Sequence, residues 1–151
     1  MGQHVQRVEF YSVQGEWGEF SNFAEYPIRL AGKTWSSVEH YFQAMKFKDK
    51  ALQEKVRRTR TPSLAARMGR DRKLPLRRDW ESAKVNVMRD AVRAKFTQHD
   101  DLRALLLSTG DARIIEHTEN DAYWGDGGDG RGKNMLGRIL MQVRAELERV
   151  E

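Results

Sequence analysis

Two acids and one lysine are the residues of this chain whose types and spacing best suit catalysis. Glu39 and Lys46 stand seven positions apart in a segment with helical periodicity, which predicts that both lie on one side of a helix, two turns apart. Their Cα atoms would then be ~10 Å apart, too far for a simple salt bridge but suitable for contact with one ligand. Both border the predicted apolar face, where partial burial raises a carboxyl pKa and lowers a lysine pKa. Such shifts produce a neutral-pH acid or an amine nucleophile.

Each of these two residues also has a purely structural interpretation. Glu39 can close an S-x-x-E capping box with Ser36 at the start of the helix. Lys46 can be a surface lysine beside Lys48 and Lys50. The pattern alone leaves both interpretations open.

Asp121 is the second carboxylate with a position that favours catalysis. It precedes two adjacent aromatic residues and a glycine-rich run. A pair of acids from different segments suits cleavage of a glycosidic bond, because one acid protonates the leaving group while the other stabilises an oxocarbenium-like centre or activates water. Trp35, Trp80 and Trp124 are candidates for stacking on a base or sugar, with core packing as the alternative for each.

The segment after Asp121 carries five glycines between Gly125 and Gly132. Ordering so many glycines costs backbone entropy, which favours a loop that approaches a phosphate or sugar closely over one without a function. A mobile tether is the alternative, although tethers seldom contain adjacent aromatics such as Tyr123 and Trp124. The run also satisfies G-x-x-x-x-G-K, but Asn134 replaces the Ser or Thr of a P-loop and no hydrophobic strand leads directly into it.

A cluster of positively charged residues lies near the middle of the chain. Six of them fall within twelve residues and are opposed only by Asp71: Arg67, Arg70, Arg72, Lys73, Arg77 and Arg78. Such a cluster attracts phosphate on a nucleotide, a sugar or a nucleic acid. A solubilising surface loop is the alternative interpretation.

The composition limits the class of protein. A length of 151 residues predicts one domain over residues 1–151 with its core at about 10–147. The net charge of +5 is only mildly basic. The absence of cysteine excludes disulfides and thiolate-held metals. No apolar run approaches the ~20 residues of a membrane span and no signal-peptide core is present, so we expect a soluble cytoplasmic protein. The four histidines lack metal-ligand spacing, so we expect His40 and His117 to be structural, and no metal or cofactor.

The periodicity predicts a mainly helical α+β fold, a compact multi-helix domain with a small β element. We expect short strands at residues 8–12, 28–30 and around 114–115, with a turn at Gly32 and Lys33. We expect six helices: one beginning at Ser36, one over 51–58, one from Thr61 to Gly69, one capped by Asp79, one from Asp100 or Asp101 to Gly110, and one opened by Asn134.

An ordered set of motifs resembles the YbiA-like family, whose members are also called NADAR domains. The resemblance extends from about Phe10 to about Leu147, and only the ordered set is specific. The motifs are Phe20-Ser21-Asn22-Phe23, Trp35-x-x-x-Glu39-His40-Tyr41-Phe42-Gln43-Ala44-x-Lys46-Phe47, Ala66-Arg67-x-Gly69-Arg70, Trp80, Lys95-Phe96, Glu116-x-Thr118-x-x-Asp121-x-Tyr123-Trp124-Gly125 and Gly132-x-Asn134-x-Leu136-Gly137.

The resemblance implies a small, mainly helical fold and hydrolysis of N-glycosidic bonds on ribosyl compounds. The branch that this chain resembles most acts on phosphoribosylated aminopyrimidine intermediates of riboflavin biosynthesis and releases the base from ribose 5-phosphate. By position, Glu39, Asp121 and Trp80 match the active-site acids and tryptophan of the family, and Lys46 matches its motif lysine. We therefore expect the two acids to bracket the anomeric carbon, while Lys46 anchors the sugar or forms a Schiff base with it.

The remaining motif residues are expected to bind substrate. Trp80 and Trp124 would stack on the base, and Arg67, Arg70 and the glycine-loop amides would hold the 5-phosphate. The full set of predicted substrate-binding residues is Phe20, Ser21, Asn22, Trp35, Arg67, Arg70, Tyr123, Trp124, Gly125 and Asn134.

Two other functions remain open at this point. One is an ADP-ribosyl hydrolase that removes ADP-ribose from guanine in nucleic acid, since other members of the family do this. The other is a non-catalytic module that binds ADP-ribose or a nucleotide. The expected partner is a small phosphoribosyl substrate, with ADP-ribosylated nucleic acid as the alternative and no membrane. The sequence does not fix the oligomeric state.

Overall fold

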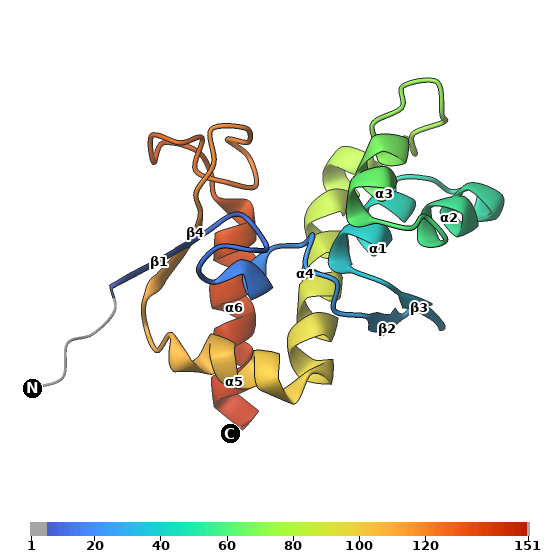
Figure 1. Ribbon diagram of the computed structural model, residues 1–151. Helices are drawn as coiled ribbons and strands as arrows, with labels where there is room; N and C mark the ends of the chain where they lie inside the picture. Colours follow the sequence, from blue (N-terminus) through green and yellow to red (C-terminus); the bar gives the residue numbers. More distant parts are fainter. Residues whose placement is uncertain (1–5, 151) are drawn as a thin grey trace, which may run out of the picture. The chain divides into compact units, whose positions relative to one another are not determined.

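The computed structural model of the protein describes residues 6–150, so residues 1–5, which include His4, and residue 151 lie outside the described part. Within residues 6–150 there are six α-helices, one 3-10 helix and four short strands, which confirms the predicted mainly helical α+β class (Figure 1). The chain divides into two compact units, one formed by residues up to 21 together with residues from 96 onward, the other by residues 22–95. Each unit is described by itself below.

A β-hairpin lies near the start of the unit 22–95. Strand β2 (Ile28–Leu30) pairs antiparallel with β3 (Lys33–Trp35), and Ile28 faces Trp35 across the ladder. The turn residues Ala31 and Gly32 both have positive φ, 55° and 76°, as a two-residue hairpin turn with the right twist requires. The prediction of a turn at Gly32 and Lys33 was wrong by one residue, and the third strand was missed.

Three short helices of this unit pack against one another, as Figure 1 shows. They are α1 (Val38–Ala44), α2 (Lys50–Arg57) and α3 (Pro62–Gly69). Every residue of α1 is buried, so this helix forms the centre of the group.

The N-termini of these helices are capped by side chains. The Asp49 carboxylate accepts from the amides of Ala51 and Leu52 in α2. The Thr61 hydroxyl accepts from the amide of Leu64, and Pro62 occupies the first helical position, as predicted for α3. Helix α1 is capped by Ser37, not by Ser36, because the Ser37 hydroxyl accepts from the His40 amide at 3.2 Å.

Helix α4 (Trp80–Gln98) is the longest element and contributes residues to both units. Asp79 precedes its first residue, and the Asp79 backbone carbonyl accepts from the amides of Ser82 and Ala83. The Asp79 carboxylate forms a two-bond fork with the Arg77 guanidinium, with N–O distances of 2.6 and 2.8 Å.

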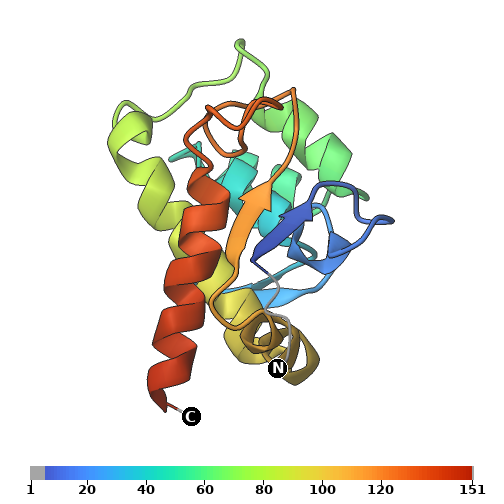
Figure 2. The ribbon, with the colours of Figure 1, turned by 90° about the vertical axis from the view of Figure 1, so that its left-hand side faces the viewer.

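The other unit is built on a parallel strand pair and a long helix. Strand β1 (Arg7–Phe10) pairs with β4 (Arg113–Glu116), and β4 packs on α6 (Met135–Val150), as Figure 2 shows. Helix α5 (Asp100–Ser108) packs against α6 as well. A Cβ at Gly137 would lie 2.1 Å from the carbonyl oxygen of Ile114, so only glycine permits this approach of helix to strand.

The 3-10 helix (Gly18–Phe20) supplies an aromatic ring to the core of this unit. The Phe20 ring contacts Phe10 at 5.9 Å, Trp17 at 5.6 Å and Phe96 at 5.8 Å between ring centroids. Across residues 6–150, no helix is both long and apolar enough to cross a membrane.

Candidate functional site

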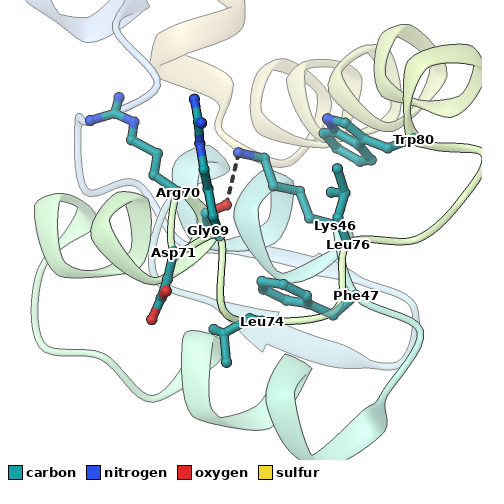
Figure 3. A pocket seen from close by; sticks show the side chains of 9 residues that line it. Lys46, Phe47, Gly69, Arg70, Asp71, Leu74, Leu76 and Trp80 are labelled. Atoms are coloured by element: carbon teal, nitrogen blue, oxygen red, sulfur yellow. Dashed lines mark hydrogen bonds between the residues drawn. The ribbon is translucent and has the colours of Figure 1, made fainter.

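A cleft of about 390 Å³ opens in the unit 22–95 where the chain leaves α1, leaves α3 and enters α4. This volume is suitable for a small ligand. Figure 3 shows Lys46 reaching toward the carbonyl of Gly69, with the Trp80 indole on one side and Phe47, Leu74 and Leu76 also lining the cleft. The complete lining is Lys46, Phe47, Gly69, Arg70, Asp71, Arg72, Leu74, Leu76 and Trp80. Three predicted site residues, Lys46, Arg70 and Trp80, are therefore brought together.

Lys46 is held by one hydrogen bond and two aromatic rings. Its Nζ donates to the Gly69 carbonyl at 3.3 Å and lies 5.7 Å from the ring centroid of Phe42 and 5.9 Å from that of Trp80. The two rings meet edge to face at 5.1 Å. Aromatic faces attract an ammonium group but leave it with fewer water contacts than it has in solution.

Burial is the main reason why the pKa of Lys46 is lowered from its usual value. The negative charge of Glu39 opposes the shift, while the positive charges of Arg70 and Lys84 add to it. A lysine in this state gives up its proton more readily than a surface lysine, which suits it to nucleophilic chemistry. The surface-lysine interpretation of Lys46 is wrong.

The periodicity predicted that Lys46 and Glu39 lie on one helix, and this prediction was wrong. Helix α1 ends at Ala44, and Lys46 occupies the turn that follows, where its amide donates to the carbonyl of Gln43 at 3.2 Å. The Arg77 amide in turn donates to the Lys46 carbonyl at 2.8 Å and so ties this turn to the loop before α4.

Glu39 is 5% exposed and lies in the first turn of α1. Since Ser37 is the cap, Glu39 does not stand at the third helical position, and the capping-box interpretation is wrong. Its backbone amide donates to the carbonyl of Asn22 at 3.2 Å, and its carboxylate Oε2 accepts from the Nε2 of Gln43 at 2.7 Å. A buried carboxylate with an amide donor is an acid held in one orientation.

The cationic cluster contributes to the rim of the cleft. Arg70, the residue that ends α3, also lines a neighbouring hollow together with Ser63, Arg67 and Asp71. The two arginines predicted to bind phosphate thus both line this hollow and are exposed. Arg77, in contrast, is engaged by Asp79 and by the carbonyl of Met45.

Four other predicted binding residues have structural contacts. Phe20 and Trp35 are each 1% exposed, and the Trp35 Nε1 donates to the Leu30 carbonyl at 2.9 Å. Ser21 is buried, and the Asn22 amide nitrogen donates to the sulfur of Met88 at 3.3 Å. These contacts support the fold, and a part in substrate binding stays a prediction for all four.

Asp121 belongs to the other unit, at the start of the glycine-rich loop. Its Oδ1 accepts from the amides of both Tyr123 and Trp124 at 2.8 Å, a local turn that fixes the chain direction. The rings of Tyr123 and Trp124 meet edge to face at 4.9 Å. The meeting of Asp121 with Glu39 at one sugar stays a prediction.

Gly125 and Asn134 hold this loop together. A Cβ at Gly125 would lie 2.8 Å from the Thr118 side chain, and the Gly125 carbonyl accepts from the Asn134 amide at 3.0 Å. The Asn134 side chain accepts from the Glu116 amide and donates to the Ile114 carbonyl, and its φ of 52° precedes α6. The loop is therefore ordered by its own contacts, and the tether interpretation is wrong.

Asp126 is a residue that the sequence interpretation missed. It is 4% exposed, and it accepts from the amides of Thr118 at 3.1 Å and Gly128 at 2.9 Å and from the Nδ1 of His117 at 2.8 Å. Burial favours the neutral acid, but these hydrogen bonds outweigh it and lower the pKa of Asp126. Its place between Gly125 and Gly127 was a signal in the sequence that could have indicated it.

The two predicted structural histidines are both hydrogen-bonded. The ring of His40 is placed between the Ser37 hydroxyl and the Thr59 carbonyl, and burial lowers its pKa. His117 is paired with Asp126, which raises the pKa of the imidazole. Within the described part of the chain, no group of three or more His, Asp or Glu side chains is arranged to hold a metal.

Comparison with known proteins defines the class to which this fold and site belong. The NADAR domain family matches residues 9–148, and the chain belongs to this family, as its ordered motifs predicted.

Individual relatives are similar over almost the whole chain. The chain is 59% identical to N-glycosidase YbiA of Escherichia coli (strain K12) over 148 residues, which cover 96% of this chain and 92% of that protein. It is 48% identical over 143 residues to a riboflavin biosynthesis protein of Vibrio vulnificus, covering 95% of this chain and 39% of that protein. The NMR structure of E. coli YbiA matches with a TM-score of 0.90 and 56% identity, covering 99% of this chain and 90% of that chain.

Proposed function

We propose that this protein is an N-glycosidase that releases the base from phosphoribosylated aminopyrimidine intermediates of riboflavin biosynthesis, with ribose 5-phosphate as the other product. The observation that carries the proposal is Lys46, an amine held at a cleft by two aromatic rings, with a lowered pKa and the charge of Glu39 nearby. The names of the E. coli and Vibrio relatives support the reaction class and the metabolic setting.

The proposed chemistry divides between the acid and the amine. In the direct route, water adds to C1 of the ribose, the C1–N bond breaks, and Glu39 transfers the proton that the leaving base requires. In the covalent route, the neutral Lys46 amine attacks C1 of the opened sugar and displaces the amine of the base. The resulting Schiff base is hydrolysed by water, which restores the lysine. Asp121 is the proposed second acid in either route.

The binding roles follow from side-chain chemistry. The Trp80 indole, which is 6% exposed and lines the cleft beside Lys46, is the proposed aromatic contact to the base. Arg70 and Arg67 offer planar guanidinium groups to the 5-phosphate. We propose Tyr123 and Trp124 as further contacts to the base.

Incubation with candidate substrates tests the proposal. The purified protein is mixed separately with the phosphoribosylaminopyrimidines, NAD, ADP-ribose and ADP-ribosylated DNA, and free base is followed by mass spectrometry. Release from the phosphoribosylaminopyrimidines alone is the expected result. If the protein bound these compounds but released no free base from any of them, the proposed catalytic function would be contradicted and a nucleotide sensor supported.

The role of Glu39 is tested by Glu39→Gln, which keeps the shape and removes the acid. We expect a loss of ~10²–10⁴-fold in kcat, the scale of general acid–base catalysis. Glu148→Gln, at an exposed glutamate of α6, is the matched control and should keep the full rate. Near-normal turnover of a folded Glu39→Gln protein would remove Glu39 from the mechanism.

Borohydride distinguishes the two routes. Reduction during turnover would trap a covalent ribose adduct on Lys46 if the Schiff-base route operates, and Lys46→Arg would abolish the adduct. Failure to trap an adduct with an active enzyme would favour direct hydrolysis.

One observation favours a second substrate class, an ADP-ribosyl group on guanine. Arg70 lines both the Lys46 cleft and the neighbouring hollow with Arg67, so a ligand with two phosphates could meet a cation in each space, although Asp71 also lines both. A steep fall in binding with rising salt would support nucleic acid, because phosphate contacts release counterions. A metabolite with one phosphate would show only a shallow dependence.

A further inference from the structure

Gln43 stands on α1 between the acid and the lysine, one turn beyond Glu39. Its Nε2 donates to the Glu39 carboxylate at 2.7 Å, and both side chains are buried. An ionised carboxylate accepts only, so it selects the amide nitrogen of Gln43 and directs the amide oxygen away. A charge-assisted bond at this distance restricts the rotamers of both side chains.

The amide oxygen of Gln43 is the unusual atom of this pair. Among side chains of residues 6–150, Oε1 of Gln43 is the buried polar atom that has no hydrogen-bond partner. An unpartnered buried acceptor costs about 1–3 kcal/mol, which offsets what the bond to Glu39 contributes, so stability alone gives no reason for a glutamine here. Methionine would fill the same space without this cost.

The same side chain lies directly against Gly69. A Cβ built at Gly69 would be 1.8 Å from Oε1 and 2.7 Å from Cδ of Gln43, so the glutamine occupies the space that any larger residue would need. The carbonyl of Gly69 is the hydrogen-bond acceptor of Lys46 Nζ. Gln43 therefore touches the Glu39 carboxylate on one side and the residue that anchors Lys46 on the other.

We propose that Gln43 is a positioning residue that fixes the Glu39 carboxylate and, by its packing against Gly69, the Lys46 ammonium in one mutual arrangement. This inference rests on the proposed N-glycosidase function. Gln43 itself is buried and transfers no proton; it acts through the two groups that it orients.

Gln43→Met tests the inference, because methionine keeps the volume against Gly69 but cannot donate to Glu39. We expect kcat for base release to fall roughly 10- to 100-fold, since small displacements of reacting groups have effects of that size, with KM nearly unchanged. The thermal midpoint should change little, because removal of the unpartnered oxygen offsets loss of the donor to the Glu39 carboxylate. Gln142→Met, at an exposed glutamine of α6, is the matched control and should keep both rate and midpoint.

A double mutant distinguishes positioning from general support of the fold. If Gln43 acts through Glu39, Gln43→Met should add little further loss in kcat when Glu39→Gln is already present. Full additivity of the two losses, or a normal kcat for Gln43→Met alone, would overturn the inference. Absence of base release by the unaltered protein would instead refute the proposed function, so the two failures are distinguishable.

Discussion

Substitution of Asp126 by alanine should strongly destabilise the glycine-rich loop. The Oδ1 atom of Asp126 accepts from the amides of Thr118 and Gly128, and Oδ2 accepts from His117. Asp129 lies in the same loop and accepts from the Arg131 amide, but its side chain is 62% exposed. The two aspartates therefore form a matched pair that differs in burial.

The magnitude follows from the donors that the substitution leaves unpaired. A buried backbone N–H without an acceptor costs about 1–3 kcal/mol, so the loss of both amide contacts predicts a destabilisation of about 3 kcal/mol. That corresponds to roughly a 100-fold fall in the folding equilibrium constant. Asp126→Asn keeps one acceptor oxygen for the two amides and should cost about 1 kcal/mol. Asp129→Ala should cost under about 0.5 kcal/mol, because water replaces the aspartate at an exposed amide.

Urea unfolding, followed by circular dichroism, measures these differences in the free energy of unfolding. The pH of the measurement is chosen from the pKa shifts of His117 and Asp126. The pKa of His117 is raised, so its contribution is complete below its ordinary pKa of 6.5 and is lost as the pH rises through the raised pKa. The pKa of Asp126 is lowered, so its contribution is complete above 3.8 and is lost as the pH falls through the lowered pKa. About pH 5.5 lies inside this window. An Asp126→Ala protein as stable there as Asp129→Ala would refute the reasoning.

Three further predictions concern the cleft. The kcat of base release should rise with pH through an inflection below the ordinary lysine pKa of 10.5, because burial lowers the pKa of Lys46. A pH–rate profile that is flat up to pH 10.5 would contradict a role for the neutral amine. Arg70→Ala should raise KM about tenfold for a 5-phosphorylated substrate and leave KM for its dephosphorylated form unchanged, as steady-state kinetics with both compounds would show. Gly69→Ala should lower the free energy of unfolding by about 1–3 kcal/mol in urea titrations because its Cβ overlaps Gln43, and a neutral effect would mean that the glutamine is free to move away.

Local sequence signals predicted most of the elements because those signals act over a few residues. Thr61 and Pro62 begin α3, as their capping and backbone preferences require. Asn134 precedes α6 as predicted, but its side chain bonds to Ile114 and Glu116 of β4. Such signals could not decide whether Ser36 or Ser37 caps α1, because serine is a good N-cap residue at either position. The Glu39 amide pairs with the Asn22 carbonyl, and the ring of His40 meets the Thr59 carbonyl, so contacts with the rest of the chain fix the register.

The candidate site shows the same division. The ordered motifs gave the family, and the types of Glu39, Lys46 and Trp80 indicated their chemistry before any contact was known. The place of Lys46 beyond the end of α1 and between the rings of Phe42 and Trp80 could not be predicted, because it depends on where α1 stops and α4 begins.

The sequence by itself determined the helical class, the family and the residue types that can carry N-glycosidic chemistry, since capping, periodicity and motif order are properties of neighbouring residues. Only the tertiary structure decided which of these groups lose water and which partners they gain. Gln43 meets Gly69, and Asp126 meets Thr118 and His117, across separations of several to many residues. Burial and hydrogen bonding change the pKa of a side chain, and both arise from packing of distant segments that no local pattern encodes.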